Sequence, residues 1–197
     1  MSTVICGLAV SVDGFITGRD PGPGRGLGDG GALFDWYGSG DVPSQVFDGF
    51  HLTEPSARIF DALASRVGAT LAGHTTYTDS EDFAGGAPHP TAPLVVLSRT
   101  PLPPANARQT IVSTGIVDAV EEAKRLAAGK DVGLMGGVLV TEALKAGLVD
   151  ELILHQVPIL LGAGRRFFHE LPAHIRLRIL DVVAAPDVTH LHYEVQR

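Results

Sequence analysis

The chain contains a single cysteine, Cys6, so no disulfide bond can form within it. It also lacks an excess of positive charge, because 22 acidic residues outnumber 15 basic ones and give a formal net charge of -7. This balance offers no general attraction to nucleic acid or to an anionic membrane, and we expect neither partner. No apolar run reaches the roughly 18 residues of a membrane-spanning helix, and the first residues do not resemble a signal peptide. We therefore expect a cytoplasmic protein.

Hydrophobic residues make up 45% of the 197 positions and charged residues 19%, which is typical of a well-packed globular protein. This length suits one substantial core, and no linker or internal repeat divides the chain. We expect a single domain over residues 1–197. Cys6 lies in an apolar run, which favours a buried structural role over a reactive thiol.

Apolar runs and helical patterns alternate as far as Gly147, which predicts an α/β fold with a mostly parallel sheet and ligands at the carboxyl ends of its strands. We expect strands at 4–12, 69–72, 94–97, 111–112 and 132–135, and helices at 53–67, 116–127 and 138–146. The helix at 116–127 is expected to turn Val117, Val120 and Leu126 inward. Three further strands, at 152–157, 179–184 and 189–195, follow with little helix between them, which predicts an antiparallel edge.

Residues 18–50 are rich in glycine and aspartate, and we expect a long loop without regular structure. Three aromatic residues, Phe34, Trp36 and Tyr37, favour an ordered loop that covers either a pocket or a subunit interface.

Polar or glycine-rich turns follow three of the expected strands. Glycine pairs such as Gly136-Gly137 serve packing more often than ligand binding, but the helix after this pair would offer its N-terminus to a phosphate. Taken together the three turns are a more specific signal than any one of them. They contribute Gly73, His74, Thr75 and Thr76, then Ser98 and Arg99, then Gly136, Gly137, Val138 and Leu139.

Five segments carry a resemblance that covers nearly the whole chain. They are SVDGFI (11–16), AGHTTY (72–77), VVLSRT (95–100), LMGG (134–137) and GLVDELILHQVPILLGAGRRFF (147–168). In these segments the chain resembles the dihydrofolate reductase-like superfamily, particularly the branch related to the C-terminal reductase domain of bacterial riboflavin-biosynthesis deaminase-reductases. The resemblance implies a three-layer fold with helices on both faces of the sheet and, from the habit of that branch, a homodimer.

The same resemblance implies a reductase that uses NADPH and delivers hydride to a small conjugated heterocycle, pterin-like or pyrimidine-like. Residues 136–139 would hold the pyrophosphate or the nicotinamide half, and Thr75 and Thr76 would contact phosphates. Ser98 and Arg99 would meet the adenosine ribose and its 2′-phosphate, for which a guanidinium is a natural partner. The alternatives are a surface charge for Arg99 and an ordinary turn residue for Ser98.

Two positions depart from the family pattern. His74 stands where relatives usually carry arginine, so the preference for NADPH over NADH could be weaker and pH dependent; the alternative is a simple surface histidine. Met135 stands where the riboflavin reductases usually carry glutamate, which argues against their substrate, a phosphoribosylamino-uracil. A riboflavin-pathway reductase is thus an alternative to the leading hypothesis.

No acidic residue matches the carboxylate of true dihydrofolate reductases. Asp13 ends the first strand and is the preferred acid near the chemistry, with an Asp-Gly turn as its alternative. Glu54 is a further candidate for substrate contact, or else it serves only the helix dipole. Trp36 and Tyr37 are expected either to stack on a flat ligand or to form a dimer contact. The missing carboxylate leaves open a non-catalytic protein that binds nucleotides or other ligands.

The eight histidines show no metal-ligand spacing, so no metal site is expected. His155 alternates with leucines on an expected strand and is assigned to the core or to an interface.

Overall fold

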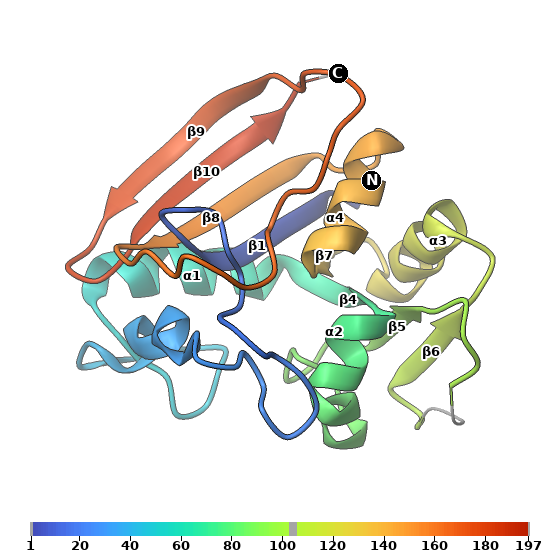
Figure 1. Ribbon diagram of the computed structural model, residues 1–197, viewed down its shortest axis with the longest axis horizontal. Coiled ribbons are helices and arrows are strands. Elements are labelled where there is room, and N and C mark those ends of the chain that lie inside the picture. The colour runs from blue at the N-terminus through green and yellow to red at the C-terminus, as the bar shows by residue number, and fades with distance from the viewer. Residues whose placement is uncertain (1, 103–105, 197) are drawn as a thin grey trace.

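The computed structural model describes residues 2–102 and 106–196. One mixed sheet forms the centre of the molecule (Figure 1). Its strands are β1 Val4–Ser11, β4 Val67–Gly73, β5 Leu94–Leu97, β6 Gln109–Val112, β7 Asp131–Met135, β8 Glu151–Val157, β9 Leu177–Ala184 and β10 Thr189–Val195. The helices are α1 Glu54–Arg66, α2 His74–Asp79, α3 Ile116–Ala127 and α4 Gly137–Lys145, with short 3-10 helices η1 Gly31–Gly38 and η2 Glu81–Gly85.

The strand order is β6-β5-β4-β7-β1-β8-β10-β9. The first six strands run parallel, and β10 pairs antiparallel with both β8 and β9. The expected mostly parallel sheet with an antiparallel C-terminal edge is confirmed.

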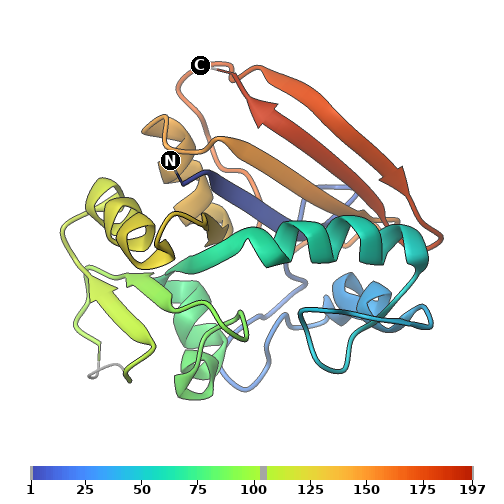
Figure 2. The same cartoon turned by 180° about the vertical axis from the view of Figure 1, so that it is seen from behind.

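Alternation along β1 explains why helices cover both faces of the sheet. Val4 and Cys6 point to the face packed by α3 and α4, whereas Ile5 points to the opposite face, where Ile59 and Leu63 of α1 lie. Figure 2 shows α1 running across this second face. Because side chains alternate along a strand, a strand apolar at every position is buried between two helical layers. Burial also raises the pKa of the Cys6 thiol, as expected for a structural cysteine.

The turn from α1 into the sheet has no connecting residue, because the helix ends at Arg66 and β4 begins at Val67. Arg66 Nε lies 2.6 Å from Asp131 of β7, and its terminal nitrogens each lie 3.1 Å from Glu151 of β8. The end of α1 is thereby tied to two strands that flank β1.

Two expectations were wrong in detail. The segment 18–50 is not without regular structure: it contains η1, and its short strand β2 Val42–Pro43 pairs with β3 His51–Leu52. Val117 does not point inward but is 53% exposed. It lies in the first turn of α3, where the core contact is made by Ala119, Val120 and Ala123.

Across the residues that the structure describes, we find no helix with both the length and the apolar character needed to cross a membrane.

Candidate active site

A cleft of approximately 1730 Å³ opens at the carboxyl ends of the parallel strands and continues under α1. We call its two regions the polar half and the aromatic half. The polar half is built by the ends of β4, β5 and β7 with the starts of α2 and α4. The aromatic half lies between α1, the segment 26–50 and the face of β1 and β8; its rings come from Phe34, Tyr37, Phe47, Phe50 and Phe60.

The Gly136-Gly137 pair opens the polar half and is required by packing. Gly136 has φ +97°, and a side chain there would collide with the hydroxyl of Thr76. A side chain on Gly137 would collide with the backbone carbonyls of Arg166 and Phe167. The glycines therefore allow close packing, as in the packing interpretation of the pair, and they leave the N-terminus of α4 at the cleft wall, where the first amides of a helix lack partners within the helix. Val138 is 64% exposed at this wall, whereas the Leu139 side chain is buried in the core.

The second turn places two hydroxyls on the same wall. Thr75 is exposed and Thr76 half-buried, and both line the cleft beside Gly73. Among residues 2–102 and 106–196, neither hydroxyl forms a hydrogen bond with the protein. These groups are free to bind an anionic ligand.

The two residues predicted at the third turn, Ser98 and Arg99, differ in position: one is buried and the other is exposed. Arg99 is exposed, lines the cleft and forms no ion pair with the described residues. Ser98 is buried behind the wall, where its hydroxyl donates to the Thr100 carbonyl at 2.6 Å. The His74 Nδ1 lies 2.9 Å from the Ser98 Oγ. Because Ser98 uses its proton on Thr100, it accepts from His74 Nδ1–H, and the other ring nitrogen of His74 is left for the cleft.

Two arginines of the tail segment close the polar half. Arg165 forms an ion pair with Asp79 of α2, and the guanidinium carbon of Arg166 lies 4.9 Å from the centre of the Phe15 ring. The tail thus brings cationic groups beside the α4 N-terminus.

The aromatic half contains a group of polar side chains beneath its rings. His155 Nδ1 lies 2.7 Å from His190 Nδ1, and His190 Nε2 lies 3.0 Å from Ser56 Oγ of α1. Burial, together with the neighbouring histidines, lowers the pKa of His155 to about 3, and burial lowers the pKa of His190 to about 4. Both rings are therefore neutral at pH 7. His155 lines the cleft, while Trp36 packs against both imidazoles with ring centres 5.1 and 5.2 Å away.

Several predicted site residues lie outside the cleft wall. Trp36 is 1% exposed in the core, and its Nε1 is the buried side-chain nitrogen for which the described residues provide no partner. Tyr37, in contrast, lines the cleft. Glu54 is exposed at the start of α1 and does not contact the cleft, as in the helix-dipole alternative.

Asp13 is held in a turn. Its carboxylate accepts hydrogen bonds from Ser11 Oγ at 2.6 Å, Leu161 N at 3.1 Å and Gly162 N at 2.7 Å. These bonds lower the pKa of the Asp13 carboxyl, the Ser11 bond most of all. The side chain joins the first strand to the tail segment and is not part of the described cleft wall. The geometry favours the turn alternative over the catalytic one.

Comparison with known proteins decides the family. The sequence profile of the RibD C-terminal domain matches residues 2–191. The chain belongs to this family. The uncharacterized protein YwjB of Bacillus subtilis strain 168 is 33% identical to this chain over 66 residues, which make up 33% of this chain and 38% of that relative.

Solved structures support the fold of this RibD C-terminal domain. A protein from Shewanella sp. PV-4, provisionally named as a riboflavin biosynthesis protein, is 25% identical with full coverage of both chains and a TM-score of 0.71. A pyrimidine reductase-like protein from Corynebacterium diphtheriae is 14% identical over all of this chain and 92% of its own, with a TM-score of 0.62. Enterococcus faecalis dihydrofolate reductase, in complex with NADP(H), is 16% identical over 99% and 97%, with a TM-score of 0.57.

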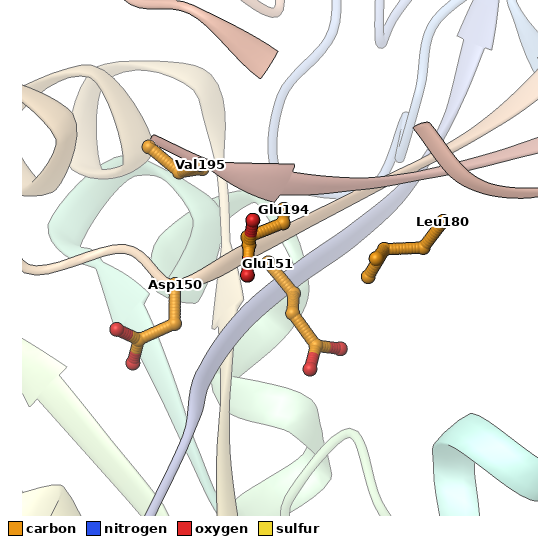
Figure 3. Close-up of a pocket in the computed structure, with 5 residues that line it drawn as sticks. All are labelled: Asp150, Glu151, Leu180, Glu194 and Val195. Atoms are coloured by element: carbon orange, nitrogen blue, oxygen red, sulfur yellow. The ribbon is translucent and has the colours of Figure 1, made fainter. Parts of the chain in front are cut away.

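A second, smaller hollow of about 290 Å³ lies at the opposite end of β8 and is acidic (Figure 3). Its carboxylates already have partners within the RibD C-terminal domain: Glu151 binds Arg66 and His192, and Glu194 binds Arg178. No group of three or more His, Cys, Asp or Glu side chains in the described ranges is arranged to hold a metal ion.

Sequence reasoning missed the polar group beneath the rings. His155 is buried, as expected of a core residue, yet it also reaches the cleft. The two histidines are brought together by the pairing of β8 with β10, because the antiparallel register sets His190 opposite His155. That register depends on tertiary structure and could not be read from residue spacing.

Proposed function

We propose that this protein is an NADPH-dependent reductase that transfers hydride to a small conjugated substrate. The observation that carries the proposal is one continuous cleft in which three strand-end turns meet a wall of aromatic rings. Family membership supports a reductase of the riboflavin or folate type, and the cofactor and substrate are our inference.

The polar half fits a phosphorylated dinucleotide. The N-terminus of α4 offers unpaired amides and the positive end of the helix dipole, and Thr75 and Thr76 add unpaired hydroxyls. Arg99 supplies a guanidinium without a competing carboxylate in the described structure, which suits a 2′-phosphate. His74 adds a ring nitrogen whose orientation is set by Ser98.

When bound, NADPH would supply the hydride from its nicotinamide ring. The residues of the cleft would orient the two reactants and exclude water, with segment 26–50 covering the aromatic half. Of Trp36 and Tyr37, the two aromatic residues predicted to stack on a flat ligand, Tyr37 is the one that lines the cleft. For Asp13 we propose a structural role, because its three hydrogen bonds already engage both carboxylate oxygens.

We further propose a cytoplasmic homodimer formed through β9. This strand is the edge of the sheet, so one side of its backbone is left for another strand. Its apolar side chains are exposed, with Ile179 at 63% and Val182 at 51%. An exposed apolar edge strand of this kind is typical of a two-fold interface.

The first experiment is a calorimetric titration of the protein with NADPH and NADH. We expect wild type to prefer NADPH, and Arg99→Ala to lose on the order of 1 to 3 kcal/mol of NADPH binding, with NADH affinity nearly unchanged. Arg125→Ala is the matched control, because Arg125 is an exposed arginine on α3 paired with Glu122. Equal affinity of wild type for both cofactors would contradict the assignment of Arg99.

Two other functions remain as test outcomes. A riboflavin-pathway reductase would turn over a phosphoribosylamino-uracil, which Met135 and the apolar rings of the aromatic half disfavour. A non-catalytic binding protein would bind NADPH tightly but would not oxidise it, whichever heterocyclic acceptor is supplied.

A further inference from the structure

The aromatic half is lined by a continuous set of rings. Tyr37 and Phe50 stack with centres 4.4 Å apart and planes inclined by 25°, and Phe47 stacks on Phe50 at 5.2 Å and 17°. Phe60 of α1 continues the wall at 6.2 Å from Phe50, inclined by 29°. Because these rings stack on one another, a flat ligand can meet their edges and the outermost faces of the stack, where edge-to-face or offset-stacked packing is favourable.

Formal charge is confined to the other half of the cleft. Of the described lining residues, the acidic and basic ones belong to the polar half: Asp79, Arg99, Glu142, Arg165 and Arg166. In the aromatic half, burial raises the pKa of the Tyr37 phenol and lowers that of the His89 imidazole, so both are neutral at pH 7. A ligand phosphate or carboxylate placed here would lose its hydration without gaining a cationic partner, which is strongly unfavourable.

His89 is also occupied within the protein. Its Nε2 lies 3.2 Å from the Ala64 carbonyl, and its Nδ1 accepts from the backbone amide of Ala92 at 3.1 Å. It has no free ring nitrogen for a ligand.

His155, in contrast, has one nitrogen to spare. Its Nδ1 is engaged by His190, whereas its Nε2 has no protein partner in the part of the chain that the structure describes. The neighbouring strand carries Gly7 at this point, and a Cβ on Gly7 would lie 3.7 Å from that Nε2. His155 is 4% exposed, and both His155 and Gly7 line the cleft.

The bonds beneath His155 allow its Nε2 either of two roles. If Ser56 Oγ–H donates to His190 Nε2, then His190 Nδ1–H donates to His155 Nδ1, and His155 Nε2 carries a proton that it can donate. If His190 Nε2–H donates to Ser56 Oγ, each bond reverses and His155 Nε2 becomes an acceptor. In both arrangements the histidine pair stays neutral and every bond is retained.

We propose that the aromatic half binds an uncharged, planar aromatic substrate, stacked on the ring wall and hydrogen-bonded at its polar edge to His155 Nε2. This inference rests on the proposed function for the meaning of "substrate", but the binding site stands on its own geometry. It sets the substrate class apart from phosphorylated sugar derivatives, because the half that would receive the sugar phosphate has no charge to meet it.

The test uses fluorescence titration with three probes. Lumichrome is an uncharged tricyclic ring with polar edges, riboflavin 5′-phosphate carries a related ring with a charged chain, and naphthalene is flat without a polar edge. We expect lumichrome to bind with a micromolar Kd, and riboflavin 5′-phosphate at least tenfold more weakly. A comparable or lower Kd for the phosphate would overturn the proposal.

Two substitutions separate stacking from hydrogen bonding. His155→Phe should raise the Kd of lumichrome about tenfold and leave that of naphthalene within about twofold, because only lumichrome uses Nε2. Phe50→Leu should weaken both probes and serves as the second variant if His155→Phe does not fold. Lumichrome binding that neither substitution alters would overturn the assignment.

NADPH titration of the same variants keeps the two proposals distinguishable. NADPH affinity should be unchanged in both, since neither residue belongs to the polar half. Lumichrome binding without NADPH binding would refute the reductase and leave this inference standing. NADPH binding without lumichrome binding would refute this inference alone.

Discussion

Acid should destabilise this protein through the buried His155–His190 pair. Both folded-state pKa values, about 3 and about 4, lie below the ordinary histidine value near 6.5 that applies to the unfolded chain. The unfolded chain therefore binds protons first as the pH falls. The stability associated with the neutral pair is fully present above about pH 6.5 and is lost as the pH falls from that value through the folded-state pKa values of about 4 and about 3.

The magnitude follows from proton linkage. Each proton that only the unfolded chain binds costs about 1.4 kcal/mol per pH unit below its pKa. From pH 7 to pH 5 this amounts to roughly 2 kcal/mol for one histidine and roughly 4 kcal/mol if both stay neutral in the folded state. Losses of this size are large against a typical total stability of 5 to 15 kcal/mol.

The assay is urea unfolding at pH 7 and pH 5, followed by the fluorescence of Trp36, which packs on both imidazoles. His190→Gln removes one of the two titrating groups and should reduce the pH-dependent loss by about half. His174→Gln is the matched control, because His174 is exposed, and it should keep the wild-type loss. Equal losses in wild type and His190→Gln would refute the reasoning.

Two further predictions concern the glycine turn and the sheet edge. Gly136→Ala should lower stability by at least about 1 kcal/mol and weaken NADPH binding, because φ is +97° and the new methyl would collide with Thr76. Gly31→Ala, at a site with open space and no positive φ, should change neither in thermal unfolding or titration; equal effects would contradict the argument. Ile179→Asp should shift a dimer to a monomer in sedimentation velocity, and a wild-type monomer would refute the β9 interface.

The central parallel strands were predictable because they are apolar on both faces. The run Leu94–Leu97 matches β5 in full. The helix expected at 116–127 has the same bounds as α3, which follows Gly115. The inward direction of Val117 was wrong, because small alanines allow α3 to pack closely and leave the first turn outside. When alanines make the core contact, the apolar periodicity of the sequence identifies the buried face of a helix only approximately.

The polar half of the cleft was also accessible from sequence, because strand-end turns on neighbouring parallel strands meet at one edge. Its details were not: Ser98 turned out to orient His74 from behind the wall. The aromatic half depends on contacts between distant segments, such as Phe47 against Phe60 and His155 against His190. Local patterns carry no information on these pairings.

The direct junction of α1 with β4 has a mechanical consequence. Because no residue connects them, α1 and β4 form one continuous segment, residues 54–73. This segment carries Phe60 at the aromatic half and ends at Gly73 in the polar half. At the junction, the side chain of Arg66 is hydrogen-bonded to Asp131 and Glu151 and fixes the end of α1 to the sheet. A ligand that displaces α1 would therefore act on its junction with β4, the strand that leads to His74.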